Sequence, residues 1–127
     1  MAYVFFNPNP EHLDTGDCTV RAISRIMKWS WEETYAKLCL HGSMLHMMPS
    51  TNAVWDDLLQ TYGYERYPIP NTCPRCYTIK QFCKDNPHGV FILATGTHVV
   101  AVVEGDYYDA WDSGDNVPVY FYMKRSK

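Results

Sequence analysis

The spacing of apolar residues changes along the chain, and this change limits the fold more than any other feature of the sequence. Up to about residue 86, apolar side chains recur three and four residues apart, as in helices with one buried face. From Val90 onward they form short runs separated by tight turns, as in the antiparallel hairpins of a meander. We therefore expect an α+β domain in which N-terminal helices pack on a C-terminal antiparallel β-sheet.

Residues that cap helices or end them set the expected element boundaries. The expected helix starts are Asp17 or Cys18, Ser30, Ser50 or Thr51, and Thr78. Gly42 and Gly63 mark the ends of the second and third helices, because glycine adopts the left-handed conformation that closes many helices. The expected strands are Val90–Thr95, His98–Val103, Asp106 or Tyr107 to Trp111, and Val117–Met123, with Tyr3–Phe6 as an edge strand.

Composition and charge narrow the function classes. Hydrophobic residues make up 46% of the chain, which is enough for one ordinary core, so we expect a single domain over residues 1–127. The net charge is −3 and the basic residues are scattered, which argues against a nucleic-acid partner. No apolar run approaches the roughly 20 residues of a membrane span, and the N-terminus lacks the pattern of a signal peptide. We expect a cytoplasmic protein.

Cys18 stands where a proline-rich loop gives way to the first expected helix. The free amides and the dipole of a helix start stabilise negative charge, so a thiol at this place ionises more easily. The same amides can bind the oxyanion that forms during acyl transfer. Asp17, the expected cap, opposes thiolate formation unless its carboxylate turns away. Cys18 is therefore a candidate nucleophile, and a small buried helix residue is the alternative interpretation.

A cysteine nucleophile needs a base, and the base needs a group that orients it. His98 is the best candidate of the five histidines, because it alone begins a strongly apolar strand. A three-residue turn before the next strand places Asp112 opposite His98, whereas a two-residue turn over 105–106 points Asp112 away. We choose Asp112 as the orienting carboxylate and Asp109 as the second candidate. A structural histidine and a purely polar turn at Asp112 are the alternatives.

The order of these residues carries a resemblance to a known superfamily. The segments concerned are Gly16–Ile23, Gly96–Val103 and Tyr108–Asp112. With cysteine at a helix start, histidine on a strand and aspartate on the next strand, the chain resembles the papain-like cysteine peptidases, including their bacteriocin-processing branch. The resemblance implies a papain-like amide hydrolase of the peptidase or isopeptidase kind, in which Cys18, His98 and Asp112 act through a thioester on a protein or peptide and require no cofactor. The whole chain also resembles small proteins of phages and gut bacteria.

The sequence departs from the papain-like pattern at the oxyanion hole. The family usually has a glutamine a few residues before the nucleophile, and no glutamine precedes Cys18. Asn7 and Asn9 are the candidate amide donors in its place. Further candidates for contact with a substrate are Asp17, Asp109 and Trp111. If no donor is present, the alternative function is a catalytically silent binding module, for example a phage accessory protein that captures a host protein.

A second group of cysteines lies in the middle of the chain. Its spacing, Cys-x2-Cys-x6-Cys-x4-His, is compatible with a tetrahedral Zn²⁺ site, because a close cysteine pair and two later ligands can bind one metal ion. The four residues are Cys73, Cys76, Cys83 and His88. A local thiol pair and ordinary structural cysteines are the alternatives, and a zinc-stabilised interaction domain is the corresponding alternative function.

Overall fold

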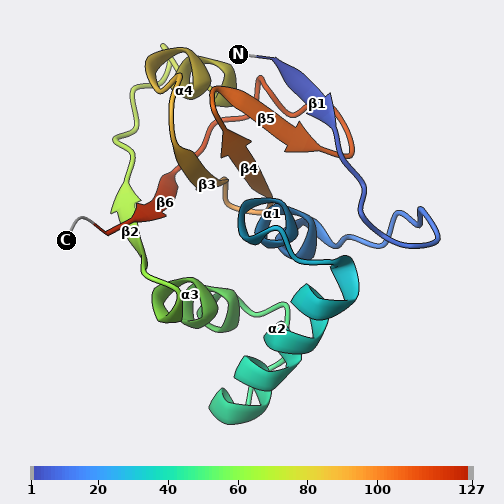
Figure 1. The fold of residues 1–127 in the computed structure, drawn as a ribbon. Helices are drawn as coiled ribbons and strands as arrows, with labels where there is room; N and C mark the ends of the chain where they lie inside the picture. The colour runs from blue at the N-terminus through green and yellow to red at the C-terminus, as the bar shows by residue number, and fades with distance from the viewer. Residues whose placement is uncertain (1, 126–127) are drawn as a thin grey trace.

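The computed structural model describes residues 2–125. Its helices are α1 (Cys18–Met27), α2 (Trp31–Leu45), α3 (Asn52–Thr61) and α4 (Ile79–Asp85), and none of them is long and apolar enough to cross a bilayer. Its strands are β1 (Tyr3–Phe5), β2 (Tyr64–Pro68), β3 (Val90–Ala94), β4 (Val99–Val103), β5 (Asp106–Asp109) and β6 (Tyr120–Lys124). Figure 1 shows the strands as one twisted sheet, with α1, α2 and α3 together and α4 apart from them. The expected α+β class is confirmed.

The sheet has six strands in the order β1-β5-β4-β3-β6-β2. Four of its strand pairs are antiparallel, but β1 runs parallel to β5 at one edge. The expectation of a purely antiparallel sheet is therefore wrong at that edge, and the sheet is mixed. The expected edge strand at the N-terminus is confirmed.

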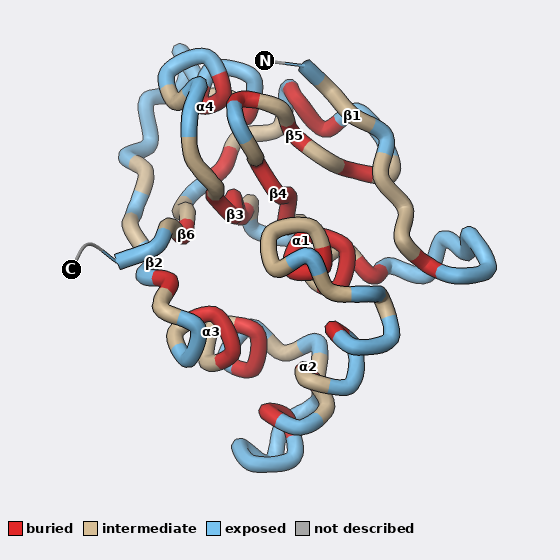
Figure 2. The backbone as a smooth tube through the Cα atoms, viewed as in Figure 1, coloured by how far each residue is buried: buried red, intermediate tan, exposed pale blue. Residues whose placement is uncertain are grey.

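The two central strands place their side chains alternately in two cores, because successive residues of a strand point to opposite faces. Ile92 and Ala101 face the core shared with α1, α2 and α3, whereas Leu93 and Val100 face α4. Figure 2 shows the resulting burial along β3 and β4. A sheet covered on both faces explains why these strands are nearly continuous apolar runs in the sequence.

Local capping fixes where the helices begin. The hydroxyl of Ser30 accepts a hydrogen bond from the Glu33 amide at 3.0 Å, which is half of the capping box that the sequence predicts. The hydroxyl of Thr78 accepts one from the Gln81 amide at 3.2 Å. Asp17 precedes α1 as expected, but its side chain makes no capping hydrogen bond. The helix starts are therefore predicted correctly, and the exception at Asp17 concerns only the role of its carboxylate.

The second helix ends three residues later than expected. It continues through Gly42 to Leu45, and His46 adopts the left-handed conformation that ends it, with φ 59°. Gly42 is needed for another reason, since a Cβ atom there would lie 2.6 Å from the carbonyl oxygen of Met47. The loop after α2 folds back against the helix at this glycine, and residues 48–50 then line a cavity at the start of α1.

The last strand and the second strand differ from the predicted meander. β6 pairs with β3 instead of β5, because β1 already occupies the free edge of β5. β2 adds to the outer edge of β6, and Tyr64 is the one buried residue in this strand. A mostly exposed strand that ends in Pro68 carries little apolar signal, which is why the sequence pattern misses it.

Candidate active site

The start of α1 and the start of β4 bring Cys18 and His98 together. Cys18 is the first residue of α1, and His98 immediately precedes β4, against which that helix packs. Both line one cavity, and each shifts the pKa of the other through a hydrogen bond and its charge, while a hydrogen bond with the Val99 backbone also lowers the pKa of Cys18. Both side chains are partly buried, and 12% of the His98 side chain remains exposed. The structure thus joins the two residues that the sequence pairs as nucleophile and base.

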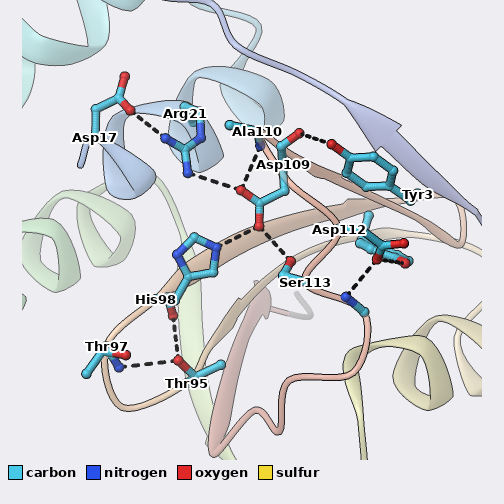
Figure 3. Close-up of polar contacts among 12 residues, drawn as sticks. Tyr3, Asp17, Arg21, Thr95, Thr97, His98, Asp109, Ala110, Asp112 and Ser113 are labelled. Atoms are coloured by element: carbon cyan, nitrogen blue, oxygen red, sulfur yellow. Dashed lines mark hydrogen bonds and ion pairs between the residues drawn. The ribbon is translucent and has the colours of Figure 1, made fainter. Parts of the chain in front are cut away.

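Asp109, and not Asp112, contacts the imidazole. His98 Nε2 and Asp109 Oδ2 lie 2.6 Å apart, and the Ser113 hydroxyl donates to the same oxygen at 2.6 Å (Figure 3). Asp112 is exposed and accepts a hydrogen bond from the hydroxyl of Tyr107. The choice of Asp112 as the orienting carboxylate is therefore wrong, and the second candidate takes this position.

The register of the hairpin between β4 and β5 explains the error. Val103 pairs with Asp106, which leaves a two-residue turn over 104–105 that neither expected register contains. Both turn residues have positive φ values, 51° and 80°, as in the primed turns that match the twist of a hairpin. Extending this register places Asp109 diagonally across from His98, within reach of a side-chain hydrogen bond.

A buried arginine links Asp109 to the start of the helix. Arg21 Nη2 donates to Asp109 Oδ1 at 3.0 Å, and its Nη1 donates to Asp17 Oδ1 (Figure 3). The other oxygen of Asp17 accepts a hydrogen bond from Trp31 Nε1 at 2.8 Å. The three charged side chains are only 1–6% exposed, so each charge depends on the others for stabilisation. The carboxylate of Asp17 is thus committed to Arg21 and Trp31 instead of capping α1.

These contacts favour an ionised Cys18–His98 pair. Burial opposes ionisation of the thiol, but the hydrogen bonds from His98 and Val99 and the charges of His98 and Arg21 outweigh it, so the pKa of Cys18 lies below its usual value. Burial also disfavours the imidazolium, yet the hydrogen bonds and charges of Asp109 and Cys18 raise the pKa of His98 to about 9. For Asp109, hydrogen bonds led by that of His98 outweigh burial and lower the pKa. Both shifts act in the same direction, toward a thiolate paired with an imidazolium.

Two adjoining cavities open at the start of α1. The smaller one, of about 140 Å³, has Cys18 and His98 in its wall, together with Asn52 at the start of α3. The larger one, of about 450 Å³, extends along α2. Trp111, a candidate for contact with a substrate, is 48% exposed and lies against the imidazole, with 4.9 Å between the ring centroids. The candidate nucleophile and base therefore face space that a substrate can enter.

The two asparagines expected to bind an oxyanion are engaged within their own loop. Asn9 Oδ1 accepts hydrogen bonds from the amides of Glu11 and Leu13, at 2.9 and 3.3 Å. Asn7 Nδ2 donates to the carbonyl oxygen of Leu13 at 3.3 Å. Neither asparagine is among the described residues that line the cavity of Cys18. Their expected role is therefore wrong, because their side chains stabilise the loop before α1.

The four candidate zinc ligands are not gathered in one place. Cys73 and Cys76 are joined by a disulfide, which accounts for their spacing, so they are neither free zinc ligands nor the free thiol pair given as an alternative. Cys83 lies on α4 with its side chain buried in the core between this helix and the sheet, and His88 is exposed beside Glu104. Over residues 2–125, no three His, Cys, Asp or Glu side chains are grouped so that they could hold a metal ion.

The sequence pattern does not predict three residues that lie in the site, namely Arg21, Ser113 and Asn52. Arg21 does carry a signal, because a charged residue three positions after Cys18 on a helix shares a face with it. Ser113 lies in a polar turn and Asn52 at a helix start, where such residues are common. Nothing in the sequence alone therefore distinguishes these two residues from ordinary turn and capping residues.

Comparison with known proteins leaves the site to be interpreted from its own geometry. No family model, curated protein or solved structure matches the chain. The functional inference therefore depends on the hydrogen-bonded cysteine, histidine and aspartate and on the cavities beside them.

Proposed function

We propose that the protein is a papain-like cysteine hydrolase that cleaves a peptide or isopeptide bond. The observation that carries the proposal is the chain of contacts from Cys18 through His98 to Asp109 at the wall of a cavity. A nucleophile bonded to a base, and a base bonded to an orienting carboxylate, is the arrangement that activates a thiol for covalent catalysis. The partial exposure of Cys18 further supports it, because a purely structural cysteine has no need of access.

In the proposed reaction, Cys18 is the nucleophile, His98 the acid and base, and Asp109 the carboxylate that orients the imidazole. The Cys18 thiolate attacks the amide carbonyl carbon, which forms a C–S bond and a tetrahedral oxyanion. Collapse of this species breaks the C–N bond while His98 gives its proton to the leaving amine, and a thioester remains on Cys18. Water then attacks the thioester as His98 accepts one of its protons, and the released thiolate completes the cycle. Asp109 holds the imidazole at Nε2, so that Nδ1 is left for the thiol.

We assign the stabilisation of the oxyanion to the Cys18 amide and the Asn52 side chain. Asn52 lines the same cavity as Cys18, and its Oδ1 accepts a hydrogen bond from Trp55 Nε1 at 3.0 Å. Because that oxygen is occupied, the amide nitrogen is the group left to donate. Asn52 also begins α3, so the positive end of this helix lies at the cavity. It takes the place of the glutamine that papain-like enzymes usually have.

Replacing Asn52 with alanine should slow amide hydrolysis by roughly 10²–10³-fold, because one of two oxyanion donors is lost. The measurement is release of p-nitroaniline from a panel of peptide p-nitroanilides. Alkylation of Cys18 by iodoacetamide is the internal control, since displacement of iodide creates no oxyanion, and its rate should change by less than about threefold. Equal loss in both assays would show that Asn52 acts on the thiolate or on the fold instead.

The proposal itself is tested by the reactivity of the free cysteines. At pH 6, Cys18 should react with iodoacetamide at least about tenfold faster than Cys39, the other partly exposed thiol. The rate should fall as the pH drops through the lowered pKa of Cys18. In His98→Gln this inflection should move upward, because the hydrogen bond and charge that favour the thiolate are gone. Peptide mass spectrometry after timed alkylation gives each rate.

Two outcomes separate the proposal from its alternatives. Equal alkylation of Cys18 and Cys39, or a pH profile that His98→Gln leaves unchanged, would contradict an activated nucleophile. An activated Cys18 that hydrolyses no anilide in the panel would favour the catalytically silent binding module.

A further inference from the structure

The carboxylate of Asp109 accepts four hydrogen bonds, although its side chain is only 1% exposed. Arg21 Nη2 and the Ala110 amide donate to Oδ1 at 3.0 and 2.8 Å. The Ser113 hydroxyl and His98 Nε2 share Oδ2, each at 2.6 Å (Figure 3). An ionised carboxylate offers about four acceptor positions, so these donors fill them and decide how the carboxylate is oriented.

The donors hold the two oxygens of Asp109 separately. Arg21 and the Ala110 amide hold Oδ1, but the bond between Cβ and the carboxyl carbon turns easily in an aspartate side chain. Such a turn moves Oδ2 away from the imidazole of His98. Among the described residues, Ser113 is the only donor to Oδ2 besides His98 itself. Its hydroxyl is therefore placed to keep this oxygen opposite Nε2.

Ser113 is itself fixed by the start of a helix. Its side chain is fully buried, and its carbonyl oxygen accepts a hydrogen bond from the Asn116 amide at 3.0 Å. The turn over 113–116 is tied to α4, because the amides of Ile79 and Lys80 donate to the carbonyl oxygens of Asn116 and Gly114, each at 3.0 Å. A hydroxyl held in this way can define the position of its partner, as groups on rigid elements do.

The burial of Ser113 leaves only an indirect role in the reaction. Ser113 lines neither of the two cavities at the start of α1, so a substrate does not touch it. A buried serine with a purely structural role needs only some acceptor for its hydroxyl, and a backbone carbonyl oxygen would suffice. The acceptor here is the carboxylate oxygen that contacts the proposed base. This choice of partner points to the chemistry of the site.

We propose that Ser113 is a positioning residue, whose hydroxyl holds Asp109 Oδ2 against His98 Nε2 and so keeps Nδ1 directed toward Cys18. The inference rests on the proposed function, because the position of the imidazole matters only if Cys18 and His98 react together. It also makes the turn over 113–116, and α4 behind it, part of the support of the site.

The pH dependence of Cys18 alkylation tests this role in Ser113→Ala. A carboxylate that is held less firmly stabilises the imidazolium less, and the thiolate loses part of its partner. The inflection of the iodoacetamide rate should therefore move upward by roughly half a pH unit or more, in the same direction as in His98→Gln. The charged and titratable neighbours of Asp109, namely Arg21 on α1, Tyr3 on β1 and His98, all remain in this variant.

Hydrolysis of a peptide p-nitroanilide gives the second measurement on the same variant. In Ser113→Ala, kcat should fall by roughly 10–100-fold, as for other small displacements of a catalytic group. KM should stay within about twofold, because uniform binding of the substrate is unaffected. A merely structural role predicts a lower melting temperature without this division between kcat and KM.

Ser24→Ala is the matched control. Ser24 is also buried, and its hydroxyl donates to the carbonyl oxygen of Trp29 at 2.7 Å without contacting Asp109 or His98. Its loss should lower the melting temperature but leave the inflection and kcat unchanged. Ser113→Thr keeps the hydroxyl and should hold kcat within about threefold of the unmodified protein. If Ser113→Ala does not fold, Ser113→Cys replaces it, because a thiol fills the space but donates only weakly.

The outcomes are separable from those of the proposed function. An activated Cys18 whose inflection is unchanged or lowered in Ser113→Ala, or a kcat that is unchanged, overturns the positioning role and leaves the nucleophile intact. An equal shift in Ser24→Ala, or a folded Ser113→Thr as slow as the alanine variant, also overturns it. A Cys18 no more reactive than Cys39 in the unmodified protein removes the proposed function, and this inference with it.

Discussion

Replacing Asp109 with asparagine should reduce hydrolysis of a peptide p-nitroanilide by about 10⁴-fold while the domain stays folded. Asp109 Oδ1 accepts hydrogen bonds from Arg21 and the Ala110 amide, so the asparagine oxygen keeps that place and its NH₂ group faces His98. An NH₂ donor at Nε2 forces the proton of a neutral imidazole onto Nδ1, the nitrogen left for Cys18. The imidazole then no longer accepts a proton there, and the charge that raises the pKa of His98 is lost as well.

Asp112→Asn is the matched control for this variant. Asp112 is exposed, and it accepts hydrogen bonds from Tyr107 and Gly114 without contacting His98. Its replacement should leave hydrolysis within about twofold of the unmodified protein, as for other surface positions. Thermal melting of both variants in the assay buffer separates loss of chemistry from loss of fold. Full activity in Asp109→Asn, or equal loss in both variants, would contradict the role given to Asp109.

These two aspartates also show where prediction from sequence stops. The cysteine at a helix start and the histidine at a strand start were found because each depends on a local signal, a cap and a change of apolar period. The orienting carboxylate depends on hairpin register, and a shift of one residue changes which side chains meet. The turn over 104–105 uses a positive φ at Glu104 as well as at Gly105. A glutamate in that conformation is uncommon, so the sequence favoured turns placed elsewhere.

The features of the fold that the sequence does not predict are contacts between segments far apart in the chain. The helix starts follow from residues within one turn of each other, such as Ser30 and Glu33, and they were predicted. The pairing of β6 with β3, and of β1 with β5, joins segments far apart in the chain, and no local pattern encodes it. For the same reason the buried link from Arg21 to Asp109, 88 residues apart, appears only in the folded structure.

Replacing Arg21 with methionine should lower the free energy of unfolding by about 3–5 kcal/mol. Methionine approximates the length of the side chain but leaves the carboxylates of Asp17 and Asp109 buried without the cation between them. Trp31 and His98 still donate to these carboxylates, so the loss is that of the shared cation alone. For a chain of this length the melting temperature should fall by roughly 10–20 °C. Urea unfolding followed by tryptophan fluorescence gives the free energy directly.

The same substitution at Arg25 provides the control. Arg25 lies one turn later on α1, where its guanidinium sits 4.3 Å from the centre of the Tyr108 ring. Within residues 2–125 it forms no ion pair with a carboxylate. Arg25→Met should therefore cost about 1 kcal/mol or less. A similar cost at both positions would mean that loss of side-chain packing, and not loss of the buried cation, explains the effect.

A double variant tests whether the buried charges act as a unit. Combining Arg21→Met with Asp17→Leu removes one of the two carboxylates that the single variant leaves without its cation. If the charges are interdependent, the double variant should be more stable than the sum of the two single losses predicts, by at least about 1 kcal/mol. Losses that simply add would show that Arg21 and Asp17 contribute independently. In that case the arginine could not be the element that couples the start of α1 to the carboxylate behind His98.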